Sequence, residues 1–196
     1  MNLDTAAARV DQARTLLAQS TLRTVQQAGL TVAFWSKSPA YTTMPLLMEL
    51  SGFAPGRVYR TEPKSRKGIF AYYTTQNKVS RSEQYDAKEK LLEVVGYEYT
   101  PERIISRKFD KRGTCESLTL TVLADEQPSW ACRVDSDGEY WCYEYTCNDG
   151  RVQNLIAYAS NSVPGTVINV EYDEEAVACL WFEGPSGRVD IFRRMQ

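Results

Sequence analysis

Small and apolar side chains recur every three or four residues along the first part of the chain. They are Leu3, Ala6, Ala7, Val10, Ala13, Leu17, Thr21, Thr24 and Ala28. This spacing is that of one face of an α-helix, so it predicts an amphipathic helix of about seven turns over residues 3–28. Asp4 or Thr5 can cap its start and Gly29 can end it.

Two short elements are predicted after this helix. Residues 31–35 are apolar and β-prone, which indicates a short strand. The stretch "MPLLMELSG" then predicts a brief helix, with Pro45 in its first turn and Gly52 just past its end.

From Arg57 onward the period changes from that of a helix to the alternation of strands. Each of several segments has an aromatic or apolar residue, then Asp or Thr, a short polar turn and an alternating apolar run. These segments begin at Glu83, Tyr97, Arg107, Cys132, Tyr143 and Val170. Self-similarity at this interval predicts a stack of hairpins. Asp137-Gly138 and Asp149-Gly150 suit tight hairpin turns, and the turn at 184–188 precedes a last strand at 189–193.

The predicted fold is therefore α+β and mostly β. It is an antiparallel β-meander, residues 57–196, with a helical N-terminal segment, residues 1–56, packed on it in a single compact domain.

Residues 86–96 are ambiguous between helix and strand, because Asp86 and Glu89 have capping-box spacing and Gly96 could end a helix. Val94 and Val95, followed by alternating tyrosines, favour a strand there.

Cysteine and histidine usage excludes several kinds of chemistry. The five cysteines are odd in number and irregularly spaced, so we expect free thiols in a reducing compartment. Cys142 and Cys147 have neither Cys-x-x-Cys spacing nor a histidine to complete a zinc site, and we expect no metal or other cofactor. Without histidine there is no Ser-His-Asp or Cys-His device. Glycine-rich phosphate and dinucleotide loops are absent too.

Location follows from what the sequence lacks. It has no apolar run long enough to span a membrane and no secretory signal at its start, so we expect a cytoplasmic protein without a membrane partner.

The stretches "QYDAKEKLLEVV" and "YEYTPERIISRKFDKRGT" resemble the Tyr-Asp repeats of bacterial Rhs-type polymorphic toxins. The resemblance covers roughly residues 57–192, although the glycine expected after the turn is often missing. The chain is too short for the shell that those toxins build. It is similar instead to the immunity proteins that accompany such toxins. That resemblance implies a bacterial binding protein without catalytic residues, which blocks a toxin by direct contact.

Charge is distributed unevenly along the chain. Residues 1–100 carry 13 basic and 9 acidic side chains, whereas residues 101–196 carry 10 basic and 16 acidic ones. Between Asp135 and Glu183 there are ten acids and one base, Arg151. Acids beside aromatic residues suit a basic protein partner and repel nucleic acid. The predicted partner face comprises Glu139, Tyr143, Glu144, Tyr145, Asp149, Glu171, Tyr172 and Asp173. The alternative is that these side chains form the solvated face of a one-sided sheet.

A basic cluster lies at the start of the predicted meander. It contains Arg57, Arg60, Lys64, Arg66 and Lys67, and it is interpreted as a solvated loop, with a phosphate or nucleic-acid patch as the alternative.

Three functions remain open. The favoured one is an immunity protein that neutralises a toxin with a basic surface. The second is a small-ligand carrier, whose sheet forms a half-barrel around Trp130, Trp141 and Trp181. The third is an enzyme that uses carboxylates, whose pairing cannot be recognised from spacing.

Overall fold

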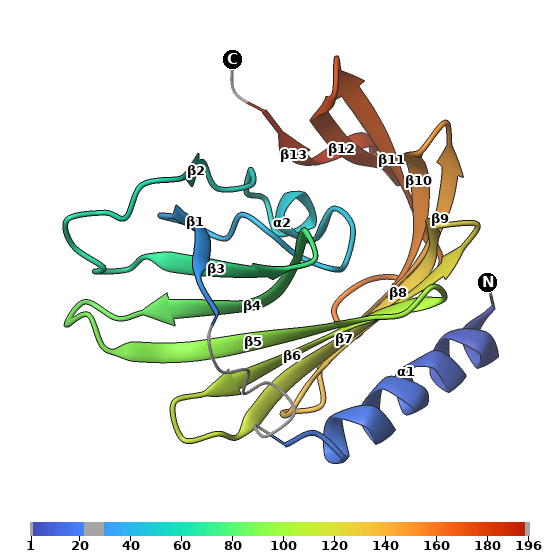
Figure 1. Cartoon of the computed structure of the whole chain (residues 1–196). Helices are drawn as coiled ribbons and strands as arrows, with labels where there is room; N and C mark the ends of the chain where they lie inside the picture. Colours follow the sequence, from blue (N-terminus) through green and yellow to red (C-terminus); the bar gives the residue numbers. More distant parts are fainter. Residues whose placement is uncertain (1, 22–29, 195–196) are drawn as a thin grey trace.

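The computed structural model describes residues 2–21 and 30–194, and its main feature is one large antiparallel sheet (Figure 1). Its thirteen strands follow the order β13-β12-β11-β10-β9-β8-β7-β6-β5-β4-β3-β1-β2. The strands are β1 (Val32–Ser36), β2 (Val58–Tyr59), β3 (Phe70–Thr75), β4 (Lys78–Tyr85), β5 (Leu91–Tyr99), β6 (Arg103–Asp110), β7 (Cys115–Ala124), β8 (Gln127–Asp135), β9 (Tyr140–Asn148), β10 (Arg151–Ala159), β11 (Thr166–Asp173), β12 (Ala176–Gly184) and β13 (Gly187–Arg193). The predicted antiparallel meander is confirmed.

The first strand ties the N-terminal segment into the meander. β1 lies between β2 and β3, with Trp35 opposite both Tyr59 and Ala71. The predicted strand at 31–35 is therefore present one residue later, and it belongs to the same sheet as the strands from β2 to β13. The sheet curls strongly but stays open, because its end strands, β2 and β13, are not paired with each other.

Aspartates at strand ends explain the repeated sequence pattern. After β4, the Asp86 carboxylate accepts hydrogen bonds from the backbone N–H groups of Lys88 (2.7 Å) and Lys90 (2.9 Å). After β6, Asp110 accepts two such bonds in the same way, from residues 112 and 114, each at 2.8 Å. These bonds satisfy backbone N–H groups in the turns that are not hydrogen-bonded to a neighbouring strand. Residues 86–90 thus form a turn and β5 follows, which confirms the strand interpretation of residues 86–96.

The N-terminal helix is shorter than predicted. Helix α1 spans Leu3–Ala18, and its cap is Asn2, whose side-chain oxygen accepts from the Thr5 N–H at 2.8 Å, so the predicted caps were wrong. The helix ends ten residues before the predicted end at residue 28; residues 22–29 lie outside the described part of the chain. Beyond Leu17 the apolar stripe continues only through threonines and one alanine. At this end the Ser20 hydroxyl donates to the Leu16 carbonyl and accepts from the Arg107 Nε in β6.

Each face of the curled sheet is covered over part of its area (Figure 1). Helix α1 lies on the convex face, where Ala6, Val10 and Ala13 are buried. They pack with Ile105, Leu118, Leu120, Cys132, Val134, Cys142 and Tyr158. The concave face carries a second core, which consists of Met44, Ala131, Tyr143, Tyr145, Val152, Leu155, Ala157, Ile168, Val170, Val177, Leu180 and Phe192.

Residues 38–54, called here the covering segment, lie on the concave side of the sheet (Figure 1). They contain the short helix α2, Leu47–Leu50. Pro45 precedes this helix instead of occupying its first turn, because Leu46 adopts a left-handed conformation (φ 63°) between them. Gly52 follows the helix as predicted, with a φ of 81° that glycine adopts without strain.

Candidate functional site

The covering segment is fixed at its first half by hydrogen bonds to the sheet. The Ala40 N–H donates to the Tyr72 hydroxyl at 2.8 Å, and the hydroxyls of Tyr41 and Tyr99 are 2.7 Å apart. The Thr121 hydroxyl in β7 donates to the carbonyl of residue 43 at 2.8 Å. Residues 40–43 are thus held against the concave face.

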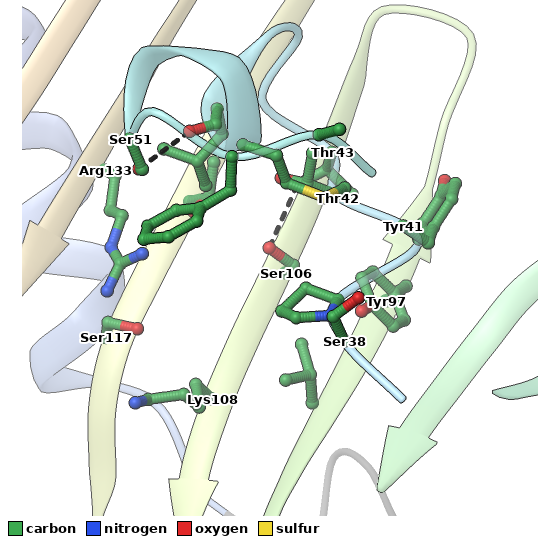
Figure 2. Close-up of a pocket in the computed structure, with 17 residues that line it drawn as sticks. Ser38, Tyr41, Thr42, Thr43, Ser51, Tyr97, Ser106, Lys108, Ser117 and Arg133 are labelled. Atoms are coloured by element: carbon green, nitrogen blue, oxygen red, sulfur yellow. Dashed lines mark hydrogen bonds between the residues drawn. The ribbon is translucent and has the colours of Figure 1, made fainter. Parts of the chain in front are cut away.

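A cavity of about 620 Å³ lies between the covering segment and the concave face (Figure 2). The covering segment lines it with five apolar residues, among them Leu47, Met48 and Phe53, and with five hydroxyl-bearing ones: Ser38, Tyr41, Thr42, Thr43 and Ser51. Phe53 is 69% exposed, an unusually large apolar surface for a phenylalanine. The sheet contributes Val95, Tyr97, Ser106, Lys108, Ser117, Thr119 and Arg133, from strands β5 to β8.

Lys108 and Arg133 are the charged side chains among the described residues that line this cavity. The Lys108 ammonium is 3.0 Å from the Glu116 carboxylate and 3.3 Å from Glu93. Burial alone would lower the pKa of Lys108, but these two carboxylates outweigh burial and raise it. Lys108 is therefore a cation at neutral pH.

Arg133 is held in one orientation by two neighbours. Its Nε and Nη2 donate to the two carboxylate oxygens of Asp135, at 2.9 and 3.3 Å. Its guanidinium also lies over the Trp141 ring, 5.4 Å from the ring centre. A bidentate pair and a cation–π contact fix the side chain and leave the N–H groups of Nη1 without a partner among the described residues.

Two hydroxyls lie between these cations. Ser117 in β7 is directly opposite Lys108, and Thr119 is opposite Arg133. The two residues are 6% and 7% exposed. Their hydroxyls have no hydrogen-bond partner among the described residues, and their oxygens remain accessible from the cavity. Figure 2 shows Arg133, Ser117 and Lys108 following one another along one side of the cavity. The neighbouring Ser106 differs, because its hydroxyl pairs with that of Thr43 at 3.0 Å.

Among the described residues, the lining supplies hydrogen-bond donors and no general base. Besides the two cations, its titratable groups are Tyr41 and Tyr97. Burial raises the pKa of both phenols above their ordinary value near 10. Every titratable group in the lining is thus protonated at neutral pH, and none can accept a proton from a bound molecule.

The predicted partner residues do not share one face of the sheet. Tyr143 and Tyr145 are 6% and 7% exposed and belong to the concave core. Glu144, between them, points to the convex side, where it lies 3.7 Å from Arg9 of α1. Alternation correctly separates residue 144 from its neighbours. Both sides of the strand contact other segments here, although the Glu144 side chain keeps 35% of its surface exposed.

The other predicted partner residues lie apart from one another. Asp149 is exposed in the β9–β10 turn and Asp173 is exposed at the end of β11, so both lie at the same end of the meander. Glu139 lies at the opposite end of β9 and accepts from the Ser160 hydroxyl. Glu171 forms a two-point pair with Arg188, and the Tyr172 hydroxyl donates to a backbone carbonyl at 3.0 Å.

The tryptophans of the half-barrel hypothesis are not gathered around one cavity either. Trp130 lies beneath α1, with Arg9 4.7 Å from its ring centre. Trp181 is stacked by Arg188 at 4.5 Å. Of the three, Trp141 alone packs with the concave core, beside Arg133. The concave face does enclose a cavity, but other residues line it.

The basic cluster has mixed surroundings. Arg66 pairs with Glu62 and lies 5.1 Å from the Trp35 ring centre and 5.4 Å from that of Tyr85. Arg57 lies over Tyr59 at 5.8 Å.

One sequence pattern relates to the cavity. In "SLTLT", residues 117–121, hydroxyl side chains alternate with leucines. The leucines are buried beneath α1, and the hydroxyls at 117 and 119 face the cavity. Lys108 and Arg133 carried no comparable signal, because isolated cations in alternating strands are usually solvated.

Comparison with protein-family models, with curated proteins and with solved structures finds no match to this chain. Within residues 2–21 and 30–194, no cluster of three or more Cys, Asp or Glu side chains could hold a metal ion. In the same part of the chain, neither helix is long and apolar enough to cross a membrane.

Proposed function

We propose that this protein is a non-catalytic binding protein, which holds its ligand in the cavity between the covering segment and the concave face of the sheet. The observation that carries the proposal is the pair of hydroxyls at Ser117 and Thr119. Both are more than nine-tenths buried, both line the cavity, and neither has a partner among the described residues. Both hydroxyls are accessible from the cavity and have no partner within the described residues, so they are free to bond to a ligand or to water there.

The size and chemistry of the cavity support the same function. Ligand sites are commonly concave, about 300–1,000 Å³ in volume, and mostly apolar with a few placed polar groups. This cavity has about 620 Å³, apolar side chains from the covering segment and a row of donors on the sheet. The absence of a base among its described lining residues favours binding over catalysis.

A pair of alanine-to-tryptophan variants tests the proposal. Ala54 lines the cavity in the covering segment, whereas Ala124 is exposed at the end of β7, outside the cavity. The neutral dye Nile red is expected to bind the wild-type protein saturably, with one dye per chain, and to brighten as it leaves water. Ala54→Trp fills the site and is expected to weaken binding by at least about tenfold, whereas Ala124→Trp leaves it unchanged.

The outcomes are distinguishable. Circular dichroism establishes that both variants keep the wild-type sheet. Non-saturable dye binding by the wild-type protein, or equal binding by Ala54→Trp and Ala124→Trp, would show that the cavity is not a ligand site.

Toxin neutralisation stays a prediction from the repeat resemblance. Of its predicted partner residues, Asp149 and Asp173 are exposed at one end of the meander, where they are accessible to a basic protein. If they steer such a partner, changing both to Lys slows association at low salt without changing stability.

A further inference from the structure

We infer that the ligand is an uncharged amphipathic molecule, with an apolar body and a neutral hydrogen-bond acceptor, such as an amide, ester or alcohol oxygen, at one end. This inference rests on the proposed function, since it concerns the occupant of the same cavity. The acceptor end lies against Ser117, Thr119 and Arg133, and the apolar body lies under the covering segment.

The balance of charge around the donors argues against an anionic ligand. Lys108 and Arg133 contribute two positive charges, but Glu93, Glu116 and Asp135 contribute three negative ones, all within 2.9–3.3 Å of those cations. The cations are already compensated. These five half-buried side chains carry a net charge of about −1. A carboxylate or phosphate on the ligand would add a fourth negative charge beside them.

A cationic ligand is disfavoured for a different reason. The three carboxylates are not among the side chains that line the cavity, whereas both cations are. A positively charged head group would therefore meet the ammonium and the guanidinium first.

The hydrogen bonds that remain available match a neutral acceptor. Arg133 uses Nε and Nη2 for Asp135 and keeps the N–H groups of Nη1. Ser117 and Thr119 can each donate one O–H, and they lie on the strand between the two cations. A carbonyl, ester or alcohol oxygen offers lone pairs to these donors without bringing charge.

The remainder of the cavity fits an apolar body. Leu47, Met48 and Phe53 line it from the covering segment, and Val95 lines it from β5. Phe53 keeps 69% of its surface exposed, so a ligand that packs against it removes apolar surface from water. The cavity thus offers an apolar surface at these four residues and hydrogen-bond donors on β7 and β8.

Two probes of equal chain length test the inference, decanamide and decanoate, as competitors of Nile red at pH 7.4. Decanamide is expected to displace the dye at concentrations at least about tenfold lower than decanoate. Glu116→Gln removes one negative charge beside Lys108 at a side chain that is 43% exposed, so the fold should tolerate it. It should strengthen decanoate binding several-fold and leave decanamide unchanged.

A second variant tests the acceptor contact. Ser117→Ala is expected to weaken decanamide by about three- to tenfold, the usual loss for one hydrogen bond. The matched control is Ser162→Ala, which removes an exposed hydroxyl in the β10–β11 loop and should change nothing.

Failure of the inference and failure of the proposed function give different results. If Nile red binds and Ala54→Trp blocks it, but decanoate competes as well as decanamide or neither competes, the cavity binds ligands and the neutral amphipathic ligand is wrong. If Nile red itself does not bind in the cavity, the proposed function is wrong.

Discussion

A substitution at Tyr145 can distinguish two roles for this side chain. The sequence predicts an exposed partner-binding residue, whereas the structure places Tyr145 in the core. Its side chain is 7% exposed in the concave core, and its hydroxyl donates to the Pro45 carbonyl of the covering segment at 3.2 Å. Tyr145→Ala removes a buried aromatic ring and this hydrogen bond. Truncation of a buried aromatic side chain to alanine costs about 3–5 kcal/mol of unfolding free energy.

The size of the effect can be measured in two ways. For a chain of this length, each kcal/mol lowers Tm by about 2–4 °C, so the expected decrease is about 6–20 °C. Urea unfolding followed by tryptophan fluorescence should show a lower midpoint with an unchanged slope. Tyr145→Phe keeps the ring and loses only the bond to Pro45, and should cost about 0.5–1.5 kcal/mol.

Phe53→Ala is the matched control, because it also truncates an aromatic residue but at a position that is 69% exposed. Its unfolding free energy should stay within about 0.5 kcal/mol of the wild-type value. If Tyr145→Ala were as stable as Phe53→Ala, Tyr145 would not be a core residue, and the covering segment would not depend on it.

Three further predictions concern ionisation and thiols. Glu49 in α2 is 7% exposed, and burial raises the pKa of its carboxyl, so the ionised form opposes folding. Glu49→Gln should therefore raise Tm at pH 7. Below about pH 4 the carboxyl is protonated in both the folded and the unfolded chain, and the substitution should leave Tm unchanged. Arg188 and Arg193 lower the pKa of Asp190 to about 2. The ionised carboxylate therefore stabilises the fold at neutral pH, and this stabilisation is lost as pH falls from about 4 toward 2. Asp190→Asn should lower Tm at pH 7 and have the same Tm as the wild-type protein near pH 2. All five cysteines are free, so excess reductant should not change Tm, and neither should a chelator; a decrease of several degrees with either would refute this.

Local sequence determined the strands and turns of this protein. Period-two alternation predicts strands because successive side chains in a strand point to opposite faces. Asp86 and Asp110 predict turns because a short carboxylate can accept backbone amides two and four residues ahead. These interactions join residues that are close in sequence, so a single sequence shows them. The N-terminal helix was also predicted from local periodicity, in its start and its buried face but not in its end.

Contacts between distant residues decided the rest. The end of α1 involves a hydrogen bond between Ser20 and Arg107, and the covering segment is held by bonds from Thr121 to Thr43 and from Tyr145 to Pro45. These pairs are 87, 78 and 100 residues apart, and no local pattern relates them.

The candidate site depends on the same long-range packing. Alternation shows that Tyr145 and Glu144 face opposite ways, but it cannot show that α1 covers one face and residues 38–54 the other. Only the curled sheet brings Lys108, Ser117 and Arg133 beneath the covering segment. The physical reason is that strand parity is set by the geometry of each residue, whereas burial depends on which other segment packs against that face.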